Sequence, residues 1–342
     1  MIERRKTEAW ASINDGVRST LGAPGLVSSL WLANLLLALP AGWLVRQHVS
    51  HSIGPSLFHQ TLREGFDLDW YSEYEQATGG LAATLRPSIV GPGAVLDNLE
   101  LWFSGGLFSQ HLSLLALALA HAVLWLLLLG GIIARLAGMQ GLETATDSHA
   151  TGEVLGPAGL ILRGVRMSPR ILQLSVVAGL LYFAVYRLAW IVFPWIERAC
   201  HDVTQERTLL TYHLIAAVCV VALLTAINLL FDYAKIVVVL EPKLSPSSAL
   251  ARAMQLVVAN AGQVALVYYG LGAALLAVSA LYLLLAPGAG QSTTLGILGA
   301  FVVGQLYLWF RFAGRLVFLG SATALYGRLC GKAAPLPSAG RP

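Results

Sequence analysis

The sequence predicts an all-α integral membrane protein with six transmembrane helices, and its composition and apolar patterning both support this class. Hydrophobic residues make up 56% of the 342 residues and charged residues only 12%, with a mean hydropathy of +0.68. A typical soluble domain carries about twice that share of charged residues. The long apolar blocks cover residues 26–46, 107–137, 171–196, 209–240, 256–286 and 295–325. Each block supplies the ~20 residues that cross a ~30 Å hydrocarbon layer as a helix, and none alternates like a membrane β-strand.

The N-terminal segment, residues 1–25, precedes the first apolar block and is predicted to be a cytoplasmic amphipathic segment. It carries Arg4, Arg5 and Lys6 and lacks the apolar centre of a cleavable signal peptide. We therefore expect the first transmembrane helix to direct insertion into the membrane.

The basic residues are distributed unevenly between the two sides of the predicted spans. Most of the 22 Lys and Arg residues fall on the side of the N-terminus, and basic residues concentrate on the cytoplasmic side of membrane proteins. This bias predicts a multi-pass protein of the cell inner (cytoplasmic) membrane with both termini in the cytoplasm. It also accounts for the basic pI of about 9.0, so no nucleic-acid partner is expected.

Basic residues also mark an internal repeat. A short segment with an arginine leads into each odd-numbered block, and each even-numbered block ends with a small residue followed by a basic one. The pattern predicts three helical hairpins, each preceded by a short cytoplasmic amphipathic helix. We interpret these basic residues as contacts to lipid head groups, with a ring of cations around a cytoplasmic vestibule as the alternative. They are Arg18, Arg135, Arg166, Lys235, Arg252 and Arg315.

The chain is predicted to form one membrane domain over residues 1–342, with a disordered cytoplasmic tail at 327–342. Its first hairpin differs from the other two, because it contains an extracytoplasmic insertion over residues 47–105. Gly and Pro residues divide this insertion into predicted short helices at 55–66, 68–77, 80–85 and 94–103. Long structured loops commonly carry function, so the insertion is the first candidate for an interaction site.

Acidic and aromatic residues are concentrated at the centre of the insertion, over residues 66–75. Asp69 and Glu73 are four residues apart, on one face of a helix. Paired carboxylates can carry out acid–base chemistry or bind a cation, whereas an interfacial helix would place the aromatic residues among head groups and the acids in water. The candidate extracytoplasmic interaction residues are Asp67, Asp69, Trp70, Glu73 and Trp102.

Histidines gather at the start of the insertion, at positions 48, 51 and 59. Imidazoles at this spacing can share a metal ion, but no Cys or Glu ligand motif accompanies them. We therefore predict no metal and no cofactor.

Ionisable residues lie inside the predicted spans, and the candidate intramembrane polar residues among them are His121, Asp232, Lys235 and Arg311. Arg187 lies toward the outer part of the third span. Ionisable residues in a membrane are costly and are candidates for function. Asp232 and Lys235 are three residues apart and can neutralise each other. His121 has no such neighbour in the sequence, so a proton relay, a haem ligand and a hydrogen bond between helices, to Asn34, Asn228, Gln263 or Gln305, stay open.

One segment resembles known sequences. Val237-Val-Val-Leu-Glu241, followed by Ser248-Ala-Leu-Ala-Arg-Ala-Met254 and another span, resembles poorly characterised bacterial polytopic membrane proteins. These include the membrane domain attached to some glycerophosphodiester phosphodiesterases. The resemblance covers about residues 225–285 and implies a helical membrane fold without the catalytic barrel.

The sequence contains no phosphate-binding loop, dinucleotide fingerprint, nucleophile elbow or zinc-protease motif, which argues against an enzyme. We therefore predict an accessory subunit for interaction or assembly, acting through its insertion on membrane lipids, other membrane subunits or a second copy. The alternatives are a transporter or permease for a lipid-like or small solute, and a membrane-surface enzyme acting on lipid-linked substrates. A common cavity around the four intramembrane ionisable residues would favour transport.

Overall fold

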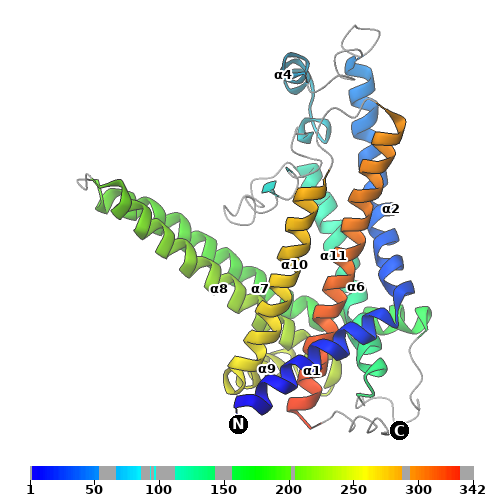
Figure 1. Cartoon of the computed structure of the whole chain (residues 1–342), viewed down its shortest axis with the longest axis vertical. Helices are drawn as coiled ribbons and strands as arrows, with labels where there is room; N and C mark the ends of the chain where they lie inside the picture. The colour runs from blue at the N-terminus through cyan, green and yellow to red at the C-terminus, as the bar shows by residue number, and fades with distance from the viewer. Residues whose placement is uncertain are drawn as a thin grey trace. The chain divides into compact units, whose positions relative to one another are not determined.

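The computed structural model of the chain is helical throughout its described residues. Those residues are 2–53, 67–85, 93, 96–97, 112–142, 156–201, 205–286 and 293–331. Within them the chain forms nine α-helices and one short 3-10 helix (Figure 1). Six of the helices are long and apolar enough to cross a membrane, which confirms the prediction of a polytopic helical membrane protein. They are α2 (Pro24–Ile53), α6 (Leu112–Met139), α7 (Pro157–Ala199), α8 (Glu206–Leu240), α10 (Ala261–Leu285) and α11 (Thr294–Leu329).

The other helices are shorter and precede or connect the six candidate spans. α1 (Ile2–Leu21) ends two residues before Pro24 opens α2, and a proline is well tolerated in the first turn of a helix. α9 (Pro246–Ala259) has Ser245 as its N-cap and Asn260 as its C-cap. The Ser245 hydroxyl accepts a hydrogen bond from the backbone N–H of Ser248. α4 (Leu68–Ala77) matches the helix predicted at 68–77, and η1 (Ala82–Thr84) follows it.

α7 differs from the prediction, because no separate short helix precedes the third span. It runs without a break over 43 residues, and Pro169 lies inside it. Its buried residues recur every three or four positions on both sides of this proline, so one face packs continuously. They are Leu160, Gly164, Met167, Ile171, Leu174 and Ala178.

Several predicted boundaries fall elsewhere. α11 continues to Leu329, beyond the start of the predicted tail at 327, and residues 332–342 lie outside the described residues. α2 extends to Ile53, so residues 47–53 of the predicted insertion belong to a helix. The predicted helices at 55–66 and 94–103 lie outside the described residues, except for positions 96 and 97, which are helical.

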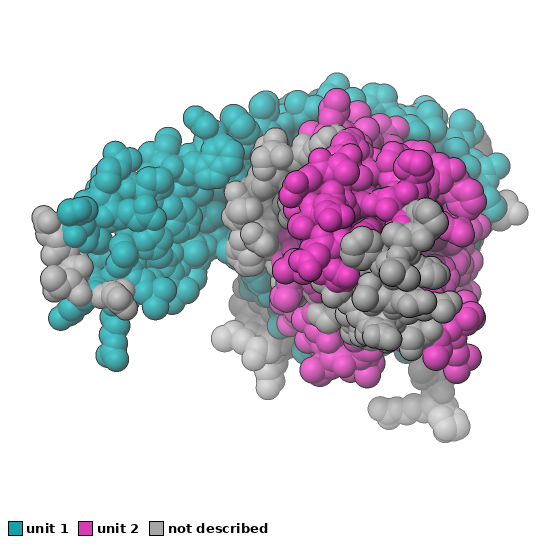
Figure 2. Space-filling view, turned by 90° about the horizontal axis from the view of Figure 1, so that it is seen from above, with its two compact units in different colours: residues 1–19, 125–269, 317–342 teal, residues 20–124, 270–316 magenta. Residues whose placement is uncertain are grey.

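The chain divides into two compact units, which Figure 2 colours separately. Unit 1 comprises residues 1–19, 125–269 and 317–342, and unit 2 comprises residues 20–124 and 270–316. Four of the helices, α1, α6, α10 and α11, contribute residues to both units.

Unit 1 contains the larger hydrophobic core. The last third of α8 lies at its centre, with Phe231 and all residues from Tyr233 to Leu240 buried except Lys235. α7 and α8 pack against each other along their length (Figure 1). α6 and α7 approach so closely that a Cβ atom on Gly164 would lie 2.0 Å from the Leu127 carbonyl oxygen. Glycine is required at this contact, since any side chain would collide with backbone.

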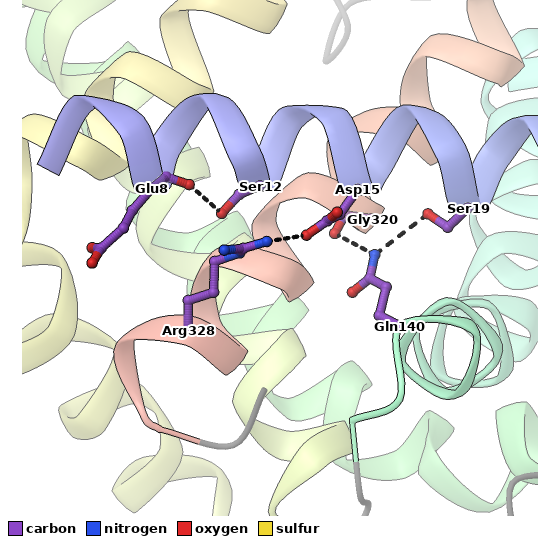
Figure 3. A network of polar contacts seen from close by, with 7 residues as sticks. All are labelled: Glu8, Ser12, Asp15, Ser19, Gln140, Gly320 and Arg328. Carbon is purple, nitrogen blue, oxygen red and sulfur yellow. Dashed lines mark hydrogen bonds and ion pairs between the residues drawn. The ribbon is translucent and has the colours of Figure 1, made fainter. Parts of the chain in front are cut away.

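Helix α1 also packs in unit 1, through a network of polar contacts (Figure 3). Asp15 forms an ion pair with Arg328 of α11. The Gln140 amide donates hydrogen bonds to the Gly320 carbonyl at 2.9 Å and to the Ser19 hydroxyl at 3.4 Å. These contacts connect α1 to the C-terminal ends of α6 and α11.

In unit 2, α2 and α11 run antiparallel and are connected by two tryptophan hydrogen bonds. The Trp31 indole donates to the Gln305 amide oxygen at 3.0 Å, and the Trp309 indole donates to the Ser28 hydroxyl at 3.3 Å. The two bonds join positions of increasing number on α2 to positions of decreasing number on α11. They therefore define which residues of α2 lie beside which residues of α11.

Candidate functional site

A cavity of about 520 Å³ lies among α2, α6 and α11 of unit 2. This volume is within the range of small-molecule binding sites. Its lining combines apolar side chains with polar and charged ones. The lining residues are Trp31, Asn34, Leu35, Leu37, Ala38, Ala41, Leu117, Ala118, His121, Gln305, Leu308, Arg311, Phe312 and Arg315.

The cavity has a charged end and an apolar end. Since α2 and α11 are antiparallel and meet at Trp31 and Gln305, residues beyond these two positions extend in opposite directions. On α2 the lining continues to Ala41 with apolar side chains after Asn34, and on α11 it continues to Arg315. At 1.5 Å per helical residue, each arm extends ~15 Å from the tryptophan contact. The arginines and the apolar residues of α2 therefore occupy opposite ends of one elongated cavity.

The charged end contains His121 of α6 together with Arg311 and Arg315 of α11. The two arginines are four residues apart, so their side chains leave the same face of α11 and repel each other by a few tenths of a kcal/mol. The three ionisable residues that line the cavity are therefore all basic. The Trp31 hydrogen bond holds the Gln305 side chain at the junction between the charged and apolar ends.

The structure brings together only part of the predicted intramembrane set. His121 and Arg311 line the same cavity, whereas Asp232 and Lys235 belong to unit 1 and pair with each other at 3.3 Å. Of the four proposed hydrogen-bond partners of His121, Asn34 and Gln305 also line the cavity. The other two lie in unit 1, where the Asn228 amide donates to the Tyr268 hydroxyl and the Gln263 amide to the Glu8 carboxylate. Arg315 had been predicted as a head-group contact, and its i, i+4 relation to Arg311 was the sequence signal for a shared site.

The other predicted head-group contacts have different surroundings. The side chains of Arg18 and Arg166 are exposed, and Arg135 is half-buried. Arg252 is also exposed and forms an ion pair with Glu241 at 3.2 Å.

In the insertion, the described residues form a small cluster of their own. Trp70 and Tyr74 of α4 and Ala82 of η1 are buried together, with Val49 and Ile53 of α2 packed against them. Trp70 is only 6% exposed, so this predicted contact residue faces the protein. Burial raises the pKa of the Tyr74 phenol above its usual value, and its hydroxyl donates to the Ala82 carbonyl at 3.1 Å.

Of the acidic residues at α4, one caps the helix and two lie on its surface. Asp67 is the N-cap, and its carboxylate accepts hydrogen bonds from the backbone N–H groups of Asp69 and Trp70. Asp69 and Glu73 are exposed. His48 and His51 lie in α2, while His59 and Trp102 lie outside the described residues. Among the residues that the structure describes, no group of three potential metal ligands is found.

Comparison with known proteins adds no relative: no protein-family model, curated protein or solved structure matches this chain.

Proposed function

We propose that the protein binds an amphiphilic anion, with an acidic head group and a hydrocarbon chain, in the cavity of unit 2. The observation that carries this proposal is the polarity of the cavity, with His121, Arg311 and Arg315 at one end and apolar α2 residues at the other. Of the functions predicted from the sequence, it is closest to the transporter or permease for a lipid-like solute, although only His121 and Arg311 of the four intramembrane candidates line this cavity.

The chemistry of arginine supports an acidic head group. A guanidinium presents several N–H donors in one plane and binds carboxylate or phosphate oxygens through paired hydrogen bonds. Both arginine side chains are exposed, and an anion between Arg311 and Arg315 would offset their mutual repulsion. The hydrocarbon chain would extend along Leu35, Ala38 and the neighbouring apolar lining.

Binding of dodecyl phosphate to the purified full-length protein in nanodiscs tests this proposal. Arg311→Gln and Arg315→Gln should each weaken binding about 10- to 100-fold, the size expected for a hydrogen bond to a charged group. Arg46→Gln is the matched control, because Arg46 lies over the Trp43 ring at 5.3 Å and outside the cavity lining. Equal affinity of all three variants would refute the proposal.

Two further ligands separate the contributions of head and chain. Inorganic phosphate alone should bind weakly, and dodecanol should bind without sensitivity to the arginine substitutions. In proteoliposomes, movement of a fluorescent alkyl phosphate between leaflets should depend on Arg311. Binding without such movement would retain the ligand site and remove the transporter class.

The proposal includes a topology. Both termini are placed in the cytoplasm of the inner membrane, with the helices arranged as three hairpins, and the charged end of the cavity then faces the cytoplasmic leaflet. The excess of basic residues on the N-terminal side supports this orientation. Labelling of single cysteines introduced at Thr7 and Ser72 from either side of the membrane tests it.

The predicted assembly role of the insertion stays a prediction. Asp69 and Glu73 are exposed on α4 and are available to a protein partner, but most of the insertion lies outside the described residues. The membrane-surface enzyme likewise stays a hypothesis, as does the resemblance to phosphodiesterase-linked membrane domains.

A further inference from the structure

Helix α1 packs on unit 1 through polar and small side chains. Ala9, Ser12, Gly16 and Ser19 are buried on its inner face. A Cβ atom on Gly16 would lie 2.1 Å from the Ser321 hydroxyl oxygen, so α1 approaches α11 to backbone contact.

An ion pair and two amide hydrogen bonds hold the same inner face of α1 against unit 1. Asp15 pairs with Arg328 and Gln140 donates to Ser19, as Figure 3 shows. The Gln263 amide donates to the Glu8 carboxylate at 2.9 Å. The polar groups on the inner face of α1 therefore bond to unit 1, whereas Thr7, Asn14 and Arg18 are exposed.

The opposite face of α1 points away from unit 1 and carries an apolar stripe, which is bordered by the exposed Thr7 and Asn14. Trp10 is 62% exposed and Leu21 is 73% exposed, although both are large hydrophobic residues. With 100° per helical residue, Trp10, Val17 and Leu21 lie within about 40° of one another. A helix that bordered water would have the opposite arrangement, with its apolar residues against the protein and its polar residues outside.

The connection to α2 indicates what covers this face. Only Gly22 and Ala23 separate α1 from α2, a candidate membrane span. Residues 19–45 contain no charged residue and no histidine, so the apolar part of that span begins directly after α1. The C-terminal end of α1 is thus held at the edge of the hydrocarbon layer.

The charge beside this face fits an anionic surface. Arg18 is exposed and lies about 80° around the helix from Trp10, at the border of the apolar face. Tryptophan favours the interface between hydrocarbon and head groups, and arginine beside it can reach lipid phosphates.

From these observations we infer that α1 lies flat in the head-group layer of one leaflet and binds anionic phospholipid through Arg18, with Trp10, Val17 and Leu21 inserted among the acyl chains. The polar contacts with unit 1 then fix the rotation of α1 about its axis. This interaction is independent of the cavity in unit 2, and neither requires the other.

Depth-dependent quenching of a fluorophore tests this inference in the full-length protein. Cys200, Cys219 and Cys330 are replaced by serine, and a dye is attached at Trp10→Cys. The protein is placed in nanodiscs of equal parts phosphatidylcholine and phosphatidylglycerol that carry spin-labelled lipid. Leu36→Cys, on the exposed surface of α2, is the lipid-contact control, and Ser247→Cys, at the exposed start of α9, is the comparison site.

The dye at position 10 should be quenched by lipid labelled near the head group, and more than at Ser247→Cys. A label carried on phosphatidylglycerol should quench it more strongly than one on phosphatidylcholine, by up to about fivefold, the effect of a single arginine beside an anionic surface. Arg18→Gln should remove this preference and leave the quenching itself.

Two results would overturn the inference. Quenching at position 10 that does not exceed quenching at Ser247→Cys would mean that α1 faces water. A dye that is shielded from both water-soluble and lipid-bound quenchers would mean that a second copy or another protein covers the apolar face. Dodecyl phosphate binding to Arg18→Gln should stay unchanged, which keeps this test separate from that of the cavity.

Discussion

The two units use the same long apolar helices differently. In α11, no described residue from Thr294 to Arg315 is buried, whereas all residues from Leu319 to Gly327 are buried. α6 changes in the same way, with no buried residue before Trp125 and nearly continuous burial from Leu129 to Ala137. The parts of α6 and α11 in unit 2 therefore need a lipid environment around their apolar side chains. The parts of these helices in unit 1 are surrounded by protein.

Small residues explain much of this difference. The buried part of α11 includes Gly320, Ser321, Ala322, Thr323 and Ala324, and such residues let helix backbones approach closely. The exposed part carries bulky residues such as Phe301, Leu306 and Phe310. Close packing leaves little space for a ligand, and the cavity lies in unit 2.

The largest expected effect tests the close packing of unit 1. Gly164→Ala places a Cβ atom against the Leu127 carbonyl, at 2.0 Å, and should destabilise the protein by more than the ~1–3 kcal/mol typical of overpacking. Thermal unfolding in detergent measures the loss. Gly179→Ala, on the same helix with open space around it, is the control and should be neutral or slightly stabilising. Similar melting of both variants would contradict tight packing between α6 and α7.

The next effect concerns the cavity of unit 2. Ala118 of α6 lines the cavity one turn before His121, and Ala118→Leu should reduce its free volume and weaken dodecyl phosphate binding by about tenfold. Thermal stability should stay the same, because the substituted position is exposed. Ala116→Leu, which is exposed but outside the lining, should bind normally. An unchanged affinity for Ala118→Leu would mean that the ligand binds elsewhere.

A smaller effect is expected where α1 docks on unit 1. Asp15→Asn removes the charge that pairs with Arg328, and both side chains are about one-fifth exposed, at 21% and 22%. The partial exposure reduces the expected cost to about 1 kcal/mol, which corresponds to an about fivefold faster hydrogen exchange along α1. Asn14→Ala, at an exposed position, is the control. Equal exchange in both variants would show that the remaining contacts of α1, at Gly16, Ser19 and Glu8, hold it without this ion pair.

The smallest effect concerns the cluster around α4. The folded-state pKa of Tyr74 is raised by burial, so the neutral phenol is favoured in the folded state. Its contribution to stability is complete below pH ~10, the usual pKa of tyrosine, and is lost as the pH rises through the higher folded value. Limited proteolysis near α4 should therefore accelerate only in strong alkali. Tyr74→Phe should remove this pH dependence and retain the packing, and a persistent alkaline transition in that variant would contradict the assignment.

The sequence predicted some elements well because their signals are local. Asp67 caps α4 through its own carboxylate, and the helix at Leu68–Ala77 was predicted with both ends. The continuity of α7 was missed, because the repeated arginine-bearing segments predicted a separate short helix before the third span. In the structure, a stripe of buried residues on both sides of Pro169 holds one helix. Trp70 was predicted at a contact surface and is buried, since Tyr74, Ala82 and α2 residues cover it.

The sequence by itself determined that six helices of this chain are able to cross a membrane. Hydropathy and length belong to each segment separately, so no knowledge of neighbouring helices is needed. It did not determine which polar side chains share a site. His121 meets Arg311 and Arg315 across about 190 residues of sequence, while Asp232 and Lys235 pair with each other. Which side chains share a site depends on how each helix is rotated about its axis and how far it is shifted along its neighbours. Both are set by tertiary contacts such as that of Trp31 with Gln305.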